Sequence, residues 1–172
     1  LSNLLADILL WGGNGFNEKV DFALYNVGGI RAAFAKGTVT YGDVVDVAPF
    51  ENKICFLSLT GSKVRELFSD VAKLGGEGLS HGVNLVITKD GQLLEATING
   101  KPVDDNQSYR VATLDYLAQG NDGLDAFKSG TAVVSPKGND NNVRFIIMNY
   151  FRDKMAHGIA VDSKVEGRII VK

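Results

Sequence analysis

Cysteine, histidine and tryptophan are scarce in this chain of 172 residues, which contains one cysteine, two histidines and one tryptophan. The single cysteine, Cys55, lies in an alternating apolar run, so we expect a buried thiol and not half of a disulfide. A catalytic metal centre needs several histidine, aspartate or cysteine ligands and an open coordination position. His81 and His157 lie far apart in the sequence and in unlike settings, which argues against such a centre.

Charge of one sign and long apolar runs are also missing. The net charge is -2, with 45% apolar and 22% charged residues, so neither a disordered polyelectrolyte nor a protein that binds nucleic-acid polymers is indicated. No segment approaches the roughly 20 apolar residues needed to cross a bilayer, and no membrane span is predicted. A chain of this length can bury a sizeable core, and a single domain over residues 1–172 is expected.

Two common catalytic motifs are absent. No serine lies in a Gly-x-Ser-x-Gly elbow, and no lysine follows Gly28 and Gly29 in the manner of a phosphate-binding P-loop. Nucleophilic serine catalysis and P-loop nucleotide hydrolysis therefore lose their main support.

Apolar periodicity predicts helices that alternate with hairpins. Helices are expected at 2–11, from a cap at Ser62 to Gly75-Gly76, and from a cap at Asp140 to His157. Strands are expected at 20–25, around 45–47, and at 54–60, 83–88, 93–98, 108–113 and 168–171. Asp90-Gly91 and Asn99-Gly100 accept positive φ angles and predict tight antiparallel turns. This pattern favours an α+β domain with mixed sheets over a doubly wound parallel sheet.

The run Asn26-Val27-Gly28-Gly29-Ile30-Arg31 follows an apolar segment directly and places an amide, a pliable turn and a guanidinium within six residues. Glycine permits close backbone approach, and arginine offers a planar donor fork for phosphate, carboxylate or sugar oxygens. Taken alone, a strand that ends in a Gly-Gly turn is more often plain chain reversal than a binding loop.

Two further loops each carry an aromatic residue and a polar neighbour, Phe50 with Asn52 and Tyr116 with Asp122. A nucleobase stacked on an aromatic side chain gains about 1 to 3 kcal/mol, and a carboxylate can accept hydrogen bonds from ribose hydroxyls. Each aromatic taken singly is better explained as a core residue near a strand end. Together they could clamp a planar base.

The order and the residue sequences of these loops resemble those of the C-terminal domain of the 5'-nucleotidase family, which includes periplasmic UDP-sugar hydrolases and surface ecto-5'-nucleotidases. The run from Asn26 to Arg31 is similar to the family's Asn-Gly-Gly-Gly-Ile-Arg. The segment from Tyr116 to Gly123 is similar to the family's Phe-Leu-Ala-x-Gly-Gly-Asp-Gly. The other matching segments span nearly the whole chain and are Leu1-Ser2-Asn3-Leu4-Leu5-Ala6-Asp7, Gly42-Asp43-Val44, Ala48-Pro49-Phe50, Leu59-Thr60-Gly61 and Tyr116-Leu117-Ala118-Gln119-Gly120-Asn121-Asp122-Gly123.

The resemblance implies a four-layer α/β/β/α fold and a site for a nucleobase. Phe50 and Tyr116 would sandwich the base, and Asn26 or Asn52 would form hydrogen bonds with its edge. Tyr116 replaces the usual phenylalanine, but a tyrosine ring can still stack.

The resemblance also implies contacts to the rest of a nucleotide. Arg31 would reach ribose or phosphate oxygens, Asp122 would hold the ribose hydroxyls, and Gly82 would approach the base through its backbone. The chain departs from the family pattern at Val27, which replaces a glycine and narrows the freedom of the loop, and at Leu124, where an aromatic residue commonly follows the Asp-Gly pair.

In full-length relatives, an N-terminal metallophosphoesterase domain carries two divalent metal ions and the attacking water, and rotation of the C-terminal domain delivers the nucleotide to them. This chain has no counterpart of that domain, so we expect no cofactor in it and expect it alone to bind without hydrolysing. Its expected partners are a nucleotide or nucleoside and a metallophosphoesterase domain or separate catalytic chain. Family members work in the periplasm or outside the cell, and the same location is expected here.

Two alternatives remain at this point. The first is a degenerate domain that persists as an interaction or structural module, which Val27, Leu124 and the absence of a further family arginine would support. The second is a self-sufficient esterase, which would require metal ligands that the sequence does not offer.

Overall fold

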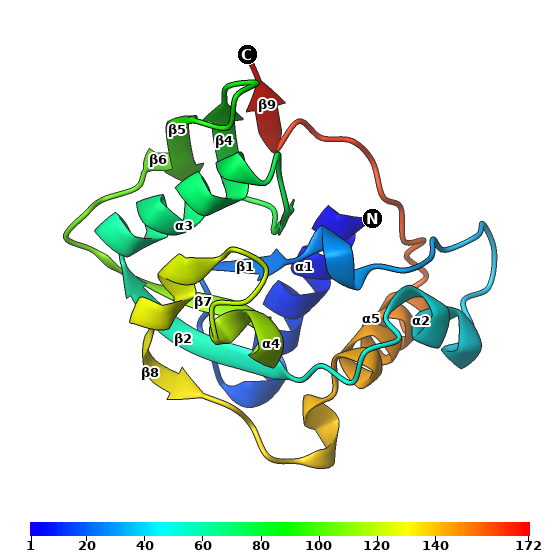
Figure 1. The fold of residues 1–172 in the computed structure, drawn as a ribbon. Coiled ribbons are helices and arrows are strands. Elements are labelled where there is room, and N and C mark those ends of the chain that lie inside the picture. The colour runs from blue at the N-terminus through cyan, green and yellow to red at the C-terminus, as the bar shows by residue number, and fades with distance from the viewer.

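Two mixed β-sheets with helices packed against them make up the fold in a computed structural model that describes residues 1–172 (Figure 1). The strands are β1 (Phe22–Tyr25), β2 (Ile54–Thr60), β3 (Gly78–Leu79), β4 (Val83–Ile87), β5 (Leu93–Ile98), β6 (Lys101–Pro102), β7 (Ser108–Leu114), β8 (Thr131–Val134) and β9 (Ile169–Val171). The helices are α1 (Ser2–Gly12), α2 (Tyr41–Val47), α3 (Gly61–Lys73), α4 (Asp115–Ala118) and α5 (Val143–Ala156). Short 3-10 turns occupy Gly13–Phe16, Val27–Gly29, Asp125–Ser129 and Asn139–Asn141.

The larger sheet has the strand order β3-β1-β7-β2-β8, and the smaller sheet has the order β6-β5-β4-β9. The pairs β1 with β7 and β4 with β9 are parallel, and all other neighbours are antiparallel. The two predicted hairpins join β4 to β5 and β5 to β6. The α+β prediction with mixed sheets, hairpins and flanking helices is therefore confirmed.

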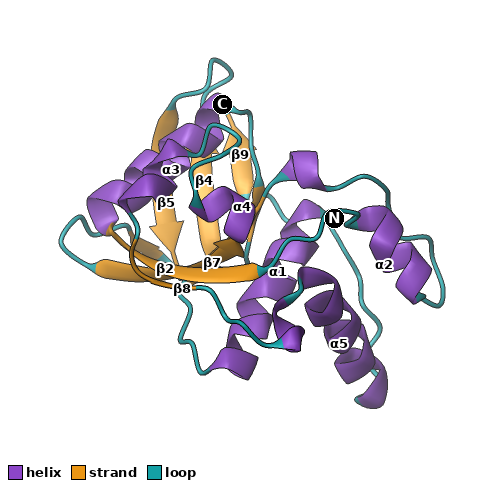
Figure 2. Cartoon of the chain, turned by 60° about the horizontal axis from the view of Figure 1, so that its bottom comes forward, coloured by secondary structure: helices purple, strands orange, loops and turns teal.

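Both faces of the larger sheet are covered, because β1 is buried at all four positions and β2 is buried along most of its length. Helices α1 and α3 pack against this sheet, and α5 packs on α1 (Figure 2). The rings of Phe22 in β1 and Phe68 in α3 lie 5.2 Å apart between centroids. A single cluster of buried apolar residues includes members of both sheets, so the two sheets form one folding unit.

The predicted apolar face of α3 is confirmed, but the helix begins earlier than expected. Its N-cap is Thr60, whose Oγ1 accepts a hydrogen bond from the Lys63 backbone N–H at 3.4 Å, while Ser62 lies inside the first turn. Gly61 joins β2 to α3 at a point where a side chain has no room. A Cβ there would overlap the backbone oxygen of Asp104.

The expected strand around 45–47 is wrong, because this segment is the end of α2. A capping box starts the helix: Thr40 Oγ1 accepts from the Asp43 N–H at 3.2 Å, and the Thr40 N–H donates to Asp43 Oδ2 at 2.8 Å. Val44 and Val47, three residues apart, form the buried face of the helix.

The last helix was placed correctly but its cap was not. Asn142 caps α5 by accepting from the Arg144 N–H at 2.9 Å, and the predicted cap Asp140 lies in the preceding 3-10 turn. Strands β3 and β8 were not predicted. The first has only two residues, and β8 is an exposed edge strand without apolar and polar alternation. No helix combines the length and apolar character that a membrane crossing requires.

Candidate functional site

Three of the predicted site residues meet in one hydrogen-bonded network. Asn26 directly follows β1 and is buried, and its Nδ2 donates to Asp122 Oδ2 at 2.5 Å. The hydroxyl of Tyr116, from α4, donates to Asp122 Oδ1 at 3.1 Å. Asp122 itself has a φ of +59°, in the left-handed region that aspartate adopts more readily than most other residues. Both carboxylate oxygens of Asp122 therefore accept a hydrogen bond, and the bond and charge of Asp122 raise the pKa of the Tyr116 hydroxyl.

The orientation of the Asn26 amide follows from the charge of Asp122. A reversed amide would direct its oxygen at the carboxylate, whereas the observed orientation directs the NH2 group at it. The amide Oδ1 is consequently buried without a hydrogen-bond partner, a cost of about 1 to 3 kcal/mol. It packs over Gly29, where a Cβ would lie 2.8 Å from Oδ1. A glycine at this position thus makes room for the amide.

Arg31 and Phe50 form a second pair. The guanidinium carbon of Arg31 lies 5.2 Å from the centroid of the Phe50 ring, within the range of a cation–π contact. Arg31 Nε donates to the backbone oxygen of Gly28 at 3.1 Å, and the Arg31 backbone N–H donates to the Val47 oxygen at 3.0 Å. The second bond connects the segment after β1 to the last residue of α2, which precedes the loop that carries Phe50.

The two aromatic residues belong to the surface and not to the core. Phe50 is 47% exposed and Tyr116 is 43% exposed, so the interpretation of each ring as a core residue is wrong. The Phe50 loop and helix α4, which carries Tyr116, are joined through Lys53 and Asp115. The Lys53 N–H donates to Asp115 Oδ1 at 3.0 Å, and the Asp115 N–H donates to the Lys53 oxygen at 2.8 Å.

Helix α5 supports the loop that carries Phe50. Arg144 Nε donates to the Ala48 oxygen at 2.9 Å, and its Nη2 donates to the Pro49 oxygen. The backbone oxygen of Asn52 accepts from the Val143 N–H at 3.0 Å at the start of the helix. Asn52 therefore anchors α5 through its main chain, and its side chain is partly buried.

Gly82 lies at the start of the smaller sheet, next to the Asn99 turn. Its φ is +91°, and a Cβ there would overlap Asn99 Oδ1. The Asn99 N–H donates to the Gly82 oxygen at 2.8 Å. The hairpin thus requires a glycine here, independently of any ligand.

Sequence reasoning missed Glu77, which contacts the turn after β1. Its Oε2 accepts from the Val27 N–H at 2.7 Å. Partial burial raises the pKa of Glu77 to about 7; the Val27 hydrogen bond acts in the opposite direction, and the charge of Asp122 adds to the rise. Only the pairing of β3 with β1 brings Glu77 here, and a two-residue strand leaves no periodic signal in the sequence.

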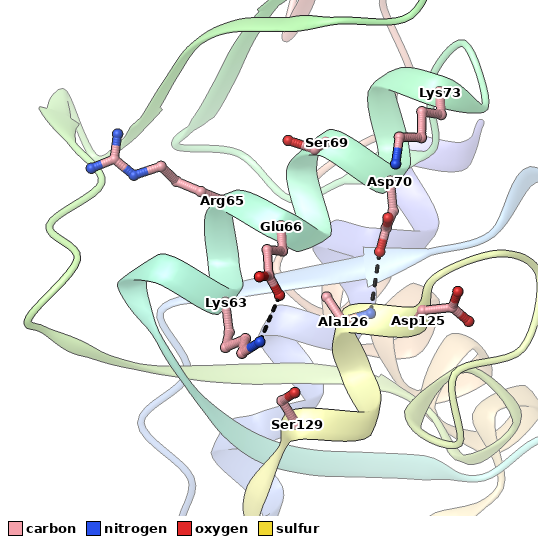
Figure 3. Close-up of a pocket in the computed structure, with 9 residues that line it drawn as sticks. All are labelled: Lys63, Arg65, Glu66, Ser69, Asp70, Lys73, Asp125, Ala126 and Ser129. Atoms are coloured by element: carbon pink, nitrogen blue, oxygen red, sulfur yellow. Dashed lines mark hydrogen bonds and ion pairs between the residues drawn. The ribbon is translucent and has the colours of Figure 1, made fainter.

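Two hollows of about 480 Å³ each lie away from these residues. Figure 3 shows the one between α3 and the Asp125–Ser129 turn. Several of its charged groups are bonded within the chain: Lys63 pairs with Glu66 at 2.9 Å, and Asp70 accepts from the Ala126 N–H at 3.2 Å. No group of three or more histidine, cysteine, aspartate or glutamate side chains is placed to hold a metal ion.

Comparison with known proteins relates this chain to one family. The family model described as the 5'-nucleotidase C-terminal domain matches residues 1–129. Protein UshA of Escherichia coli K12 is 36% identical over 107 residues, which cover 60% of this chain and 19% of that protein. The cell wall protein Lmo0130 of Listeria monocytogenes is 29% identical over 187 residues, which cover 100% of this chain and 23% of that protein.

Solved structures match over almost the entire chain. A 5'-nucleotidase precursor from Thermus thermophilus has a TM-score of 0.83 and 26% identity, and the match covers 99% of this chain and 34% of that one. The NAD nucleotidase of Haemophilus influenzae has a TM-score of 0.72 and 20% identity, and the match covers 99% of this chain and 33% of that one, which shows the shared fold. The chain thus spans about a third of these solved structures and about a fifth of the curated relatives named above.

Proposed function

Because the chain belongs to the family of 5'-nucleotidase C-terminal domains, we propose that it is the substrate-binding part of a nucleotide phosphohydrolase. The ligand is a nucleotide or nucleoside whose base lies between Phe50 and Tyr116. Hydrolysis of the phosphate ester takes place on another domain or another chain.

The observation that carries the proposal is the network around Asp122. A surface carboxylate that already accepts from an amide and a phenol, Asn26 and Tyr116, is held in a fixed position. Two vicinal ribose hydroxyls are donors of the kind that such a carboxylate accepts. The network therefore supports a role for Asp122 in holding the ribose.

The exposed aromatic rings support the second half of the proposal. Leaving large apolar side chains in water forfeits about 25 cal/mol for each Å² that could be buried. Phe50 and Tyr116 remain about half exposed although their loops are bonded to each other through Lys53 and Asp115. A planar base would cover both rings.

Arg31 is proposed to contact ribose or phosphate oxygens. Its Nε is used by the Gly28 oxygen, and the terminal nitrogens of its fork make no hydrogen bond within the chain. A guanidinium held over an aromatic ring presents these nitrogens in one plane, which suits phosphate oxygens.

The hydrolytic step is assigned to residues outside this chain. The two divalent metal ions that it uses are assigned to a metallophosphoesterase domain or chain. The greater length of the relatives is consistent with such a domain. We place the protein in the periplasm or outside the cell, which the naming of one relative as a cell wall protein supports.

A non-binding interaction module is the second candidate. The observation in its favour is that both oxygens of Asp122 already have partners within the chain, so the network is satisfied without a ligand. Leu124 is also fully buried and contributes no ring to the surface.

Calorimetric titration of the chain with adenosine, AMP and UDP-glucose separates the two candidates. Saturable binding of at least one of them is expected, weakened about 5- to 150-fold by Phe50→Ala and by Tyr116→Ala. Phe145→Ala is the matched control, since this ring is 43% exposed on α5 and should leave the affinity unchanged. No binding of any of the three compounds would favour the interaction module, and equal affinity of all variants would refute the clamp.

A further inference from the structure

Glu77 contacts the turn after β1 through the Val27 N–H. We propose that Glu77 is a positioning residue for this turn, an inference that rests on the proposed nucleotide-binding role. Its charge state sets the placement of the turn Asn26–Gly29 and thereby makes nucleoside affinity depend on pH.

The turn is held from outside by two carboxylates. Within the turn, the Gly29 N–H donates to the Asn26 oxygen at 3.2 Å and the Ile30 N–H to the Val27 oxygen at 3.0 Å. From outside, Asp122 holds the side chain of Asn26 and Glu77 holds the N–H of Val27 at 2.7 Å. Release of either carboxylate would leave one end of the turn unsupported.

The backbone of Glu77 is itself fixed. The next residue, Gly78, pairs with Tyr25 of β1, which places Glu77 opposite Asn26. A Cβ on Gly78 would overlap the Ser2 oxygen, so this strand lies directly against α1. Movement of the Glu77 carboxyl therefore requires a change in its side chain and not in its strand.

The groups that face Glu77 determine how it titrates. These are the Val27 N–H of the turn and the Asp122 carboxylate of the loop 119–123. Arg31, which follows the turn, donates to the Gly28 oxygen and lies over the Phe50 ring. Burial and the nearby Asp122 bring the pKa of Glu77 to about 7, so the group changes charge close to neutral pH.

The sign of the effect follows from the hydrogen bond. Above the pKa, the Glu77 carboxylate accepts from Val27 in a charge-assisted bond, which is roughly twice as strong as a neutral one. Below the pKa, the neutral carboxyl is a weaker acceptor and the turn is held less firmly. Affinity for the nucleoside should therefore fall as the pH decreases through about 7.

The test is calorimetric titration with adenosine, which is uncharged at these pH values, at pH 6 and pH 8. For the natural chain, the affinity at pH 8 should exceed that at pH 6 by about fivefold. Glu77→Gln keeps an acceptor oxygen without a charge, so its affinity should be the same at both pH values and close to that of the natural chain at pH 6. Glu77→Ala removes the acceptor and should bind more weakly than Glu77→Gln at both.

A second measurement needs no ligand. The NMR shift of the Val27 amide proton should titrate with a midpoint near 7 in the natural chain and should not titrate in Glu77→Gln. An unchanged pH dependence in Glu77→Gln, in either measurement, would overturn the inference. If adenosine, AMP and UDP-glucose all fail to bind at pH 8 while the Val27 amide titrates as expected, the proposed function fails and the coupling of Glu77 to the turn stands.

Discussion

Removal of the Asp7 carboxylate should destabilise the protein strongly, because Asp7 is the main partner of a buried arginine. Arg168 is 7% exposed, and its Nη1 and Nη2 donate to the two oxygens of Asp7, both at 2.9 Å. Asp7 Oδ1 also accepts from the His81 backbone N–H at 2.7 Å. One carboxylate therefore links α1 to the segments that precede β4 and β9.

The expected loss in the free energy of unfolding for Asp7→Ala is about 3 kcal/mol. Breaking a buried ion pair by removing one partner costs about 3 to 5 kcal/mol. The lower end applies because the Asp7 side chain is 21% exposed and Arg168 keeps three other acceptors: Glu166 at 3.0 Å, the Leu79 oxygen at 2.7 Å and the Asn3 oxygen at 3.5 Å. The loss would loosen β3, and with it the segment that carries Glu77.

Urea unfolding at pH 7, followed by far-UV circular dichroism and extrapolated linearly to water, measures this loss. Glu166→Ala is the control, because Glu166 bonds the same arginine but its side chain is 54% exposed. Its removal should cost less than about 1 kcal/mol. Losses for Asp7→Ala and Glu166→Ala that agree within about 0.5 kcal/mol would refute the reasoning from burial.

Three further predictions concern the stability of the fold. Hydrogen bonds from Arg110 lower the pKa of Glu18 below its ordinary 4.5, so the pair stabilises the fold above that pH and loses its effect as the pH falls through the lowered pKa. Glu18→Gln should accordingly reduce the urea midpoint at pH 7 but much less at pH 3, and equal reductions would contradict this account. Gly61→Ala should lower the free energy of unfolding by more than about 3 kcal/mol or prevent folding, because the added Cβ would overlap the Asp104 backbone oxygen. Gly15 has open space around it, so Gly15→Ala should leave the melting temperature nearly unchanged in the same thermal melt. Thr40→Ala removes the cap of α2 and should lower the unfolding free energy by about 1 kcal/mol, and an unchanged value would show that the cap does not hold α2.

Elements with a strong period were predictable from the sequence. The apolar residues of α3 recur at helical spacing, and Asp90-Gly91 and Asn99-Gly100 fit the turns that join β4, β5 and β6. The segment 41–47 was misinterpreted because three residues, Val45-Asp46-Val47, alternate like a strand. The capping box of Thr40 and Asp43, which precedes them in the chain, was the stronger signal.

The candidate site was only partly predictable. The family resemblance, which rests on the order of the motifs, predicted that Asn26, Tyr116 and Asp122 share one site. In the structure, hydrogen bonds join these three residues. The base clamp that these residues were expected to complete stays a prediction. Glu77 could not have been found, since its place depends on a two-residue strand and on long-range pairing.

The part of the chain that the family model recognises ends before the folded unit does. Beyond residue 129, β8 covers one side of β2, α5 covers α1, and Arg144 supports the loop of Phe50. A fragment cut at residue 129 would expose β2 as a bare edge, open to pairing with other copies, and would uncover the apolar back of α1. The boundary of the family match and the boundary of the packed structure therefore differ in this protein, because the segment after residue 129 covers surfaces of the segment before it.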